Sequence, residues 1–277
     1  MSEILINCDD LNATLQQAGR IIVDCRYDLE DGERGHRDYL SAHIPGAVYA
    51  DLHDDLSGPP LTDCGRHPLP SPDVQNALFR RLGINHDSGV VVYDDMFGAF
   101  AGRLWWMLRY MGHPNVMLLN GGWRHWLESG YPVQGGEQKN VPGDFTGLPR
   151  QEWLVTLDHV RDVPLLIDSR DPARYRGESE PLDRVAGHIP GARNHFWKNN
   201  LQGNGLFRPA ADIRASFEQL LAGTPAGEAA FYCGSGVTAC HNLVAAAHAG
   251  LSLPRLYAGS WSEWCADPDR PVATGVE

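Results

Sequence analysis

The sequence predicts an α/β protein built from two similar domains in tandem. Three observations support this: the chain has 277 residues, its two halves repeat the same motifs in the same order, and short apolar segments alternate with helical patterns in each half. The length suits two domains of average size. Short, wholly apolar strands separated by helices are typical of a parallel sheet covered on both faces. We therefore expect each domain to be a parallel sheet flanked by helices.

The internal repeat is visible in three pairs of segments, the third being GVVVYD at residues 89–94 and EAAFYC at residues 228–233. Residues 21–47 and 165–192 each begin with an apolar run, continue with an Asp-x-Arg triplet and end with the pentapeptide HIPGA. Residues 120–133 and 258–272 form the second pair, NGGWRHWLESGYPV and AGSWSEWCADPDRPV, with one residue inserted in the later copy. Self-similarity of this kind indicates that one structural unit has been duplicated.

A linker is predicted between the two copies, over residues 135–150. Its sequence, GGEQKNVPGDFTGLPR, is rich in Gly and Pro, and it lacks the apolar periodicity of a helix or strand. We therefore expect the first domain to span residues 1–134 and the second domain to span residues 151–277.

The strands and helices are predicted from the residue pattern within each half. Short apolar runs that end at polar or turn residues predict strands, at residues 20–24, 89–93, 116–119, 165–168 and 229–232. Apolar residues at helical spacing predict helices, at residues 10–18, 72–82, 101–111, 122–129, 210–222 and 239–249. The last helix is followed by Gly250, a residue type favoured just beyond a helix C-terminus.

Charge, hydropathy and cysteine content argue against several classes of protein. The net charge is −12, whereas nucleic-acid-binding proteins normally carry a basic surface, so we expect no nucleic-acid partner. The chain has no run of about 18 apolar residues, so we expect no membrane partner. The six cysteines include no C-x-x-C pair, which argues against a zinc site. Six is too few for a disulfide scaffold in a chain of this length.

The same features predict the location and the cofactor content. Six cysteines with no disulfide pattern indicate free thiols in a reducing cytoplasm. The apolar stretch near the N-terminus is too short for a signal peptide, which also favours a cytoplasmic location. We expect no metal and no organic cofactor.

The segment most informative about function is AAFYCGSGVTACHNLVAAAHAG, residues 229–250. An apolar strand ends just before Cys233, and a helix begins after a short loop. In an open parallel sheet, ligands bind beyond the carboxyl ends of the strands, and the unpaired N–H groups at a helix N-terminus favour an anion. A thiol in this position is shifted toward the thiolate. We therefore predict that Cys233 is a nucleophile.

The rest of this loop is predicted to bind substrate. Gly234 and Gly236 permit backbone angles that other residues avoid, and they keep side chains away from the sulfur. Val237 and Thr238 complete the loop where the helix begins, so we assign them to substrate binding together with the two glycines.

The chain resembles the tandem-rhodanese sulfurtransferases over essentially its whole length. The resemblance rests on the CGSGVT loop, the doubled HIPGA segment and the GS-W-x-x-W segment. The neutral loop is most similar to that of the 3-mercaptopyruvate sulfurtransferases, whereas the thiosulfate sulfurtransferases more often carry Arg and Lys at its second and third positions. The resemblance implies two tandem rhodanese-like domains, each a parallel sheet flanked by helices.

The resemblance also implies that only the second domain is catalytic. In the first half, the residue that corresponds to Cys233 is Asp94, which cannot carry a persulfide, and its loop, DDMFGAFAGR, is bulkier. Phosphatases that share the rhodanese architecture need an Arg six residues after the Cys to bind phosphate. That position is Ala239 here, which argues against phosphatase chemistry.

A proton relay beside the nucleophile is expected from the same resemblance. Ser235 is placed to hydrogen-bond the thiol or carbonyl of the substrate, and His67 in the segment GRHPLP matches the histidine of the family. The family's acid falls in a D-x-D pattern after the HIPGA segment. This chain has His53 at the matching position, between Asp51 and Asp54, so the identity of the acid stays open.

The resemblance to the 3-mercaptopyruvate sulfurtransferases implies that two arginines hold the carboxylate of the substrate, for which a guanidinium group offers a bidentate fork. The motif RYRG places the first at Arg174, and Arg184 is the nearest match to the second. Arg170 and its repeat Arg26 occur in both halves, which indicates a structural role.

These observations predict a sulfurtransferase that moves a sulfane sulfur from 3-mercaptopyruvate to a thiol or cyanide through a persulfide on Cys233, with release of pyruvate. The alternative donor is thiosulfate, a compact dianion that fits a neutral loop less well. The acceptor stays open among cyanide, thioredoxin, glutathione and other thiols. A non-catalytic rhodanese-like binding module is disfavoured, because the nucleophile and its full loop are retained.

Overall fold

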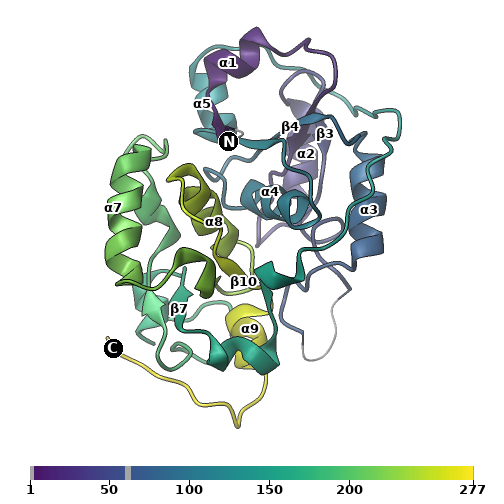
Figure 1. Cartoon of the computed structure of the whole chain (residues 1–277). Helices are drawn as coiled ribbons and strands as arrows, with labels where there is room; N and C mark the ends of the chain where they lie inside the picture. Colours follow the sequence, from purple (N-terminus) through teal and green to yellow (C-terminus); the bar gives the residue numbers. More distant parts are fainter. Residues whose placement is uncertain (1–2, 60–63, 277) are drawn as a thin grey trace. The chain divides into compact units, whose positions relative to one another are not determined.

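The computed structural model describes residues 3–59 and 64–276, and the chain divides into two compact units (Figure 1). Unit 1 comprises Met1–Gly58, Pro70–Arg150 and Gly203–Phe207. Unit 2 comprises Pro59–Leu69, Gln151–Gln202 and Arg208–Glu277. The first five residues of the GRHPLP segment, although they belong to the first half of the sequence, are therefore part of unit 2, and residues 135–150 are part of unit 1.

Among the described residues, unit 1 is organised around a parallel sheet of five strands. The strands are β1 (Leu5–Ile6), β2 (Arg20–Asp24), β3 (Val48–Tyr49), β4 (Gly89–Tyr93) and β5 (Val116–Leu119). Their order across the sheet is β1-β5-β4-β2-β3. The interior strand β4 is buried from its second residue onward, as expected for a strand with both faces covered.

Helices pack against the sheet of unit 1. They are α1 (Cys8–Ala13), α2 (Arg34–Ser41), α3 (Pro72–Arg81), α4 (Ala101–Tyr110) and α5 (Gly122–Glu128). Leu11 of α1 and Trp126 of α5 join Ile22 and Val91 of the sheet in a buried apolar cluster. Helix α4 packs against β4 and β5, and its apolar residues are almost entirely buried.

Unit 2 repeats this arrangement in the part of the chain that the structure describes. Its five parallel strands are β6 (Leu154–Val155), β7 (Leu165–Asp168), β8 (Arg193–Asn194), β9 (Ala229–Tyr232) and β10 (Arg255–Tyr257). The order β6-β10-β9-β7-β8 is the order of unit 1 with each strand replaced by its counterpart. This equivalence confirms the duplication that the repeated motifs predict.

Helices also pack against the sheet of unit 2. They are α6 (Pro172–Tyr175), α7 (Ala210–Leu221), α8 (Ala239–His248) and α9 (Ser260–Trp264), with short 3₁₀ segments at Gln151–Trp153, Leu157–Asp162, Trp197–Asn200 and Ala226–Glu228. Helix α8 packs against β9 and α7. Trp261 and Trp264 of α9 pack with Leu166 and Tyr232 of the sheet.

The α/β fold class and the parallel sheets are confirmed, and the five strands predicted from sequence match β2, β4, β5, β7 and β9. The helix predicted at 10–18 is shifted, since α1 begins at Cys8 and the chain leaves helical geometry at Thr14, with φ −118° and ψ 15°. Strands of two or three residues, such as β1 and β8, escaped prediction because so short a run has no readable periodicity.

A buried ion pair occupies the same place in both sheets. Asp24 at the end of β2 pairs with Arg26 over 2.7 Å, and Asp168 at the end of β7 pairs with Arg170 over 2.6 Å. Each arginine also donates to a backbone oxygen just before the HIPGA segment, over 2.6 Å. The Asp-x-Arg triplet therefore ties each strand end to its HIPGA turn, which supports the structural role expected for both arginines.

Among the residues described, no helix combines the length and the apolar character that crossing a bilayer requires.

Candidate active site

Cys233 follows β9 directly, and its backbone is held by α9. The amide of Cys233 donates to Ser260 Oγ over 3.1 Å, and its carbonyl accepts from the amide of Trp261 over 3.0 Å. The carbonyl of Gly234 accepts from the amide of Ser262 over 2.9 Å. Ser260 has a positive φ of 58°, which a residue other than glycine adopts at an energetic cost. The start of the loop is thus fixed at the carboxyl end of the sheet.

The thiol of Cys233 lies in a cradle of hydrogen-bond donors and is 2% exposed. Burial alone would raise its pKa, but the Thr238 hydroxyl and the backbone N–H groups of Ser235, Val237 and Ala239 donate to the sulfur. The net result is a pKa below the ordinary value for a cysteine, because each of these donors stabilises the thiolate more than the thiol. The geometry therefore favours a nucleophilic sulfur.

Replacing Thr238 with valine is expected to slow the reaction of Cys233 with iodoacetamide at pH 7 by about tenfold, because a hydrogen bond to a charged group contributes about 1.5 kcal/mol. Valine keeps the shape of threonine and removes the donor, so the pKa of Cys233 rises and the thiolate fraction falls. The rate measured between pH 5 and 10 checks this, and its midpoint should move to higher pH. An unchanged midpoint would contradict the assigned role of Thr238.

The two glycines of the loop have different functions. Gly236 has a positive φ of 74°, and a methyl group added to it would lie 2.3 Å from the carbonyl oxygen of Ala258. Both constraints require glycine at this position. Gly234 lacks a positive φ, and a methyl group there would lie 2.8 Å from Arg66 Nη2 and 3.4 Å from Arg174 Nη2. Its missing side chain leaves room for arginine side chains beside the loop.

His67 and Ser235, which are 168 residues apart in sequence, meet in unit 2. Nδ1 of His67 lies 2.8 Å from Oγ of Ser235, and both residues are buried. Either group can donate in this hydrogen bond, depending on the tautomer of the imidazole. The pair therefore has the geometry for exchanging a proton near the Cys233 thiol.

The candidate acids of the relay belong to unit 1, where they contact one another. His53 Nδ1 lies 3.0 Å from Asp54 Oδ1, and both side chains are exposed. Asp51 Oδ1 accepts from the amides of His53 and Asp54, and Asp51 Oδ2 pairs with the hydroxyl of Tyr49 over 3.2 Å. We assign the acid role to none of them.

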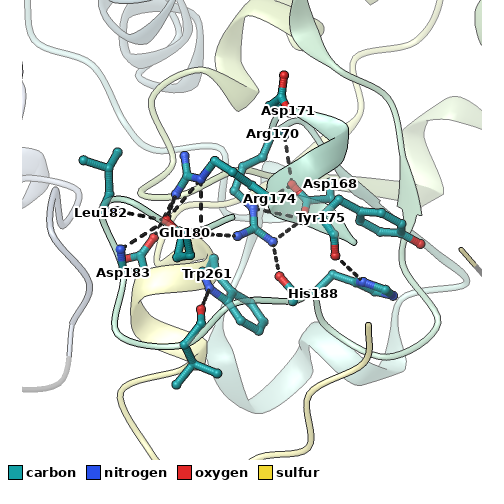
Figure 2. Close-up of polar contacts among 12 residues, drawn as sticks. Asp168, Arg170, Asp171, Arg174, Tyr175, Glu180, Leu182, Asp183, His188 and Trp261 are labelled. Atoms are coloured by element: carbon teal, nitrogen blue, oxygen red, sulfur yellow. Dashed lines mark hydrogen bonds and ion pairs between the residues drawn. The ribbon is translucent and has the colours of Figure 1, made fainter. Parts of the chain in front are cut away.

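Arg174 belongs to an ion-pair network beside the loop (Figure 2). Its guanidinium group donates to Glu180 over 2.6 Å and to Asp183 over 3.1 Å. Arg170 also donates to Glu180, over 3.1 Å, so the two arginines converge on one carboxylate. Glu180 and Asp183 are nearly fully buried, which strengthens their contacts with the arginines. Arg174 is thus held in place before any substrate binds.

Arg66 is a further charged residue at the loop, and no sequence motif predicted a role for it. Arg66 forms an ion pair with Asp183, and its guanidinium group lies against Gly234. Arg184, the second predicted arginine, is exposed and donates to the carbonyl of Ala266 over 3.3 Å. Arg66, Asp183 and Arg184 line a common cavity of about 370 Å³. The only sequence signal for Arg66 was its position next to His67.

In unit 1, Asp94 stands at the position that corresponds to Cys233. Its Oδ1 accepts from the amides of Met96 and Gly98, and its Oδ2 from those of Phe100 and Ala101, over 2.7 to 2.8 Å. Asp94 is fully buried, and burial raises its pKa to about 6 against the opposing effect of these hydrogen bonds. The cradle of unit 1 is therefore filled by a carboxylate of its own chain.

Asp94→Ala is expected to lower the free energy of unfolding by about 2–4 kcal/mol, because it leaves several buried backbone N–H groups without an acceptor. The neighbouring Asp95→Ala is the matched control. The ion pair of Asp95 with Arg34 is long, at 3.7 Å. Removing the Asp95 carboxylate is therefore expected to lower the free energy of unfolding by less than about 1 kcal/mol. Urea unfolding of the two variants checks the difference, and equal losses would contradict the role of Asp94.

Comparison with known proteins identifies the family. The model of the family described as "Rhodanese-like domain" matches residues 7–129 and 151–267, so it covers most of both repeats. The chain belongs to the rhodanese family. Both rhodanese copies have the fold of that family, and the second presents a cysteine where the first presents an aspartate.

Relatives of this rhodanese chain are known over its full length. It is 48% identical to a probable 3-mercaptopyruvate sulfurtransferase from Pseudomonas aeruginosa, covering 98% of each chain. It is 38% identical to a putative thiosulfate sulfurtransferase from Mycobacterium tuberculosis, covering 99% of this chain and 98% of that one. The solved 3-mercaptopyruvate sulfurtransferase from Leishmania major superposes with a TM-score of 0.86 at 30% identity, covering 97% of this chain and 75% of that chain.

Proposed function

We propose that this chain is a sulfurtransferase that takes a sulfane sulfur from 3-mercaptopyruvate, holds it as a persulfide on Cys233 and passes it to a thiol or to cyanide. The observation that carries this proposal is the cradle around the buried Cys233 sulfur, in which the Thr238 hydroxyl and backbone N–H groups lower the pKa of the thiol. The full-length relatives named 3-mercaptopyruvate sulfurtransferase support the same donor.

The proposed reaction has two steps. The thiolate of Cys233 attacks the sulfur of 3-mercaptopyruvate, the carbon–sulfur bond breaks, and its electron pair remains on carbon as the enolate of pyruvate. The proton of the substrate thiol, carried first by the new persulfide, moves to that carbon through Ser235 and His67 and completes pyruvate. An acceptor thiolate or cyanide then attacks the outer sulfur and releases the Cys233 thiolate.

The donors around Cys233 also suit the persulfide. A persulfide anion has its charge on the outer sulfur. We propose that this sulfur lies at the open side of the loop, where the residues Gly234, Gly236, Val237 and Thr238 surround it. Arg174 beside the loop is proposed to hold the substrate carboxylate, with Arg184 as a second candidate at the neighbouring cavity. A guanidinium group is suited to this role because it binds a carboxylate through two parallel hydrogen bonds.

Only the second rhodanese copy, residues 151–277, is proposed to carry the nucleophile. Residues 1–134 form the inactive copy, except that the segment around His67 joins unit 2, and the connection 135–150 belongs to unit 1. Asp94 supports this assignment, because a carboxylate that already accepts hydrogen bonds from its own loop can neither attack sulfur nor carry it.

Thiosulfate is the second candidate donor, and one observation favours it. The loop carries no charged side chain of its own, yet the guanidinium groups of Arg66 and Arg174 lie against Gly234. The site is therefore more cationic than the loop sequence indicates. A dianion could bind to these two guanidinium groups as well as to the backbone N–H groups. The relative named putative thiosulfate sulfurtransferase is consistent with this candidate.

A comparison of kcat/KM for the two donors tests the proposal. Pyruvate release from 3-mercaptopyruvate and thiocyanate formation from thiosulfate are measured with the same acceptor, cyanide. We expect the higher kcat/KM for 3-mercaptopyruvate. A higher value for thiosulfate would replace the donor and keep the reaction class, whereas a folded protein with neither activity would favour a non-catalytic binding module.

We further propose a cytoplasmic protein whose acceptor is a cellular thiol, with thioredoxin as one candidate. The six cysteines all lie in the described part of the chain and none forms a disulfide, as expected in a reducing compartment.

A further inference from the structure

A short segment from the first half of the sequence, Gly65–His67, lies against the catalytic loop. The amide of Arg66 donates to Ser262 Oγ over 3.1 Å, and His67 contacts Ser235. Gly65 has a φ of 73°, and a methyl group added to it would lie 2.6 Å from a backbone oxygen of unit 2. The segment is thus held closely on both sides of Arg66, which fixes where its guanidinium group extends.

A chain of alternating ion pairs leads from the end of β7 to this guanidinium group. Its members in order are Asp168, Arg170, Glu180, Arg174, Asp183 and Arg66. The series begins with a fully buried acid and ends with a cation that is 32% exposed. Among the described residues, Arg66 has one acidic partner, whereas Arg174 has two. Arg66 is therefore the arginine of this series with the most capacity for another anion.

Unused donors of this series point at the loop. Arg66 Nη2 lies 2.8 Å, and Arg174 Nη1 3.7 Å, from the position that a methyl group on Gly234 would take. In the described part of the chain, neither nitrogen donates to a carboxylate. A guanidinium group cannot lose its charge at physiological pH, so both groups remain cationic donors. They occupy the space that a side chain at the second position of the loop would fill.

The charge of Arg66 is coupled to the nucleophile. Burial lowers the pKa of Arg66, and the negative charge of Cys233 opposes that effect. The same attraction acts on any anion that approaches the sulfur, and it is strong because the surroundings are largely buried.

We propose that Arg66 is a specificity-determining residue, whose guanidinium group binds the anionic group of the sulfur donor beside Cys233 and exchanges part of its contact with Asp183 for that anion. The inference rests on the proposed function for the identity of the donor. Gly234, the second residue of the loop, has no charged side chain. Arg66 places its positive charge next to Gly234 instead.

The test compares two alkylating reagents of similar size, anionic iodoacetate and neutral iodoacetamide. The rate of each at Cys233 is followed by peptide mass spectrometry, and their ratio cancels differences in the pKa and the accessibility of the thiol. For Arg66→Gln we expect the iodoacetate-to-iodoacetamide ratio to fall about fivefold, because one nearby positive charge is lost. For Asp183→Asn we expect the ratio to rise, because Arg66 loses its competing acid. Arg66→Lys should retain part of the ratio.

The matched control is Arg214→Gln, which removes an arginine that is paired with Glu218 on the exposed side of α7. Its ratio should equal that of the wild type. An unchanged ratio in Arg66→Gln, or an equal fall in Arg214→Gln, would overturn the inference. None of these measurements requires sulfur transfer. They therefore test the role of Arg66 even if the protein transfers no sulfur. If transfer occurs, Arg66→Gln should raise KM for 3-mercaptopyruvate by about fivefold and change kcat less.

Discussion

Cys233→Ser is expected to lower the release of pyruvate from 3-mercaptopyruvate by about 10³-fold or more, because a serine hydroxyl at neutral pH is a weak nucleophile and cannot carry a sulfane sulfur. The cradle should accept the substitution, since a hydroxyl is smaller than a thiol and forms hydrogen bonds with the same donors. We therefore expect the variant to fold as the wild type does, which circular dichroism and thermal unfolding check.

Cys240→Ser is the matched control for this prediction. Cys240 lies in the first turn of α8, is fully buried and donates to the carbonyl of Gly236 over 3.3 Å, and a serine can make the same hydrogen bond. We expect it to keep most of the activity. Substantial pyruvate release by Cys233→Ser, or an equal loss in Cys240→Ser, would remove Cys233 from the role of nucleophile.

Arg170→Met is expected to lower the free energy of unfolding by about 3–5 kcal/mol, because it leaves the buried Asp168 without its cation and removes one of the two cations of Glu180. Arg170 is 1% exposed and pairs with Asp168 and Glu180, which are 0% and 3% exposed. Its guanidinium group also lies 4.8 Å from the ring of Trp261. Tryptophan fluorescence, to which Trp261 is one of eight contributors, measures the free energy of unfolding in urea.

Arg26→Met in unit 1 is the counterpart that calibrates this loss. Arg26 pairs with Asp24 and lies 4.4 Å from the ring of Trp123, but it has no equivalent of the Glu180 contact among the described residues. The loss should therefore be smaller than for Arg170→Met. Activity should fall with Arg170→Met as well, because Glu180, which positions Arg174, then loses its contact with Arg170. A cost below about 1 kcal/mol would show that methionine packing replaces the ion pair.

The fold was largely predictable because both the duplication and the apolar strands can be recognised from short stretches of consecutive residues. The five strands from 20–24 to 229–232 are runs of apolar residues long enough to be recognised. Edge strands such as β3 and β8 have only two residues, and their pairing depends on the neighbouring strand instead of on their own composition.

The site was predictable only in part, because its charges come together through tertiary structure. The residues from Cys233 to Thr238 are consecutive in sequence. Their position between a strand and a helix was sufficient to predict an anion-binding loop. Arg66 is separated from Asp183 by 117 residues, and no local pattern predicts that the segment before His67 joins unit 2. Reading the loop as neutral from its own residues therefore underestimated its cationic surroundings.

The central claim is that Cys233 accepts sulfur from 3-mercaptopyruvate, and intact-protein mass spectrometry tests it most directly. The protein is incubated with 3-mercaptopyruvate and no acceptor, and we expect the gain of one sulfur atom, mapped to Cys233, with an equivalent amount of pyruvate and complete reversal by cyanide. Pyruvate release without sulfur on Cys233, or sulfur carried by a different cysteine, would contradict it.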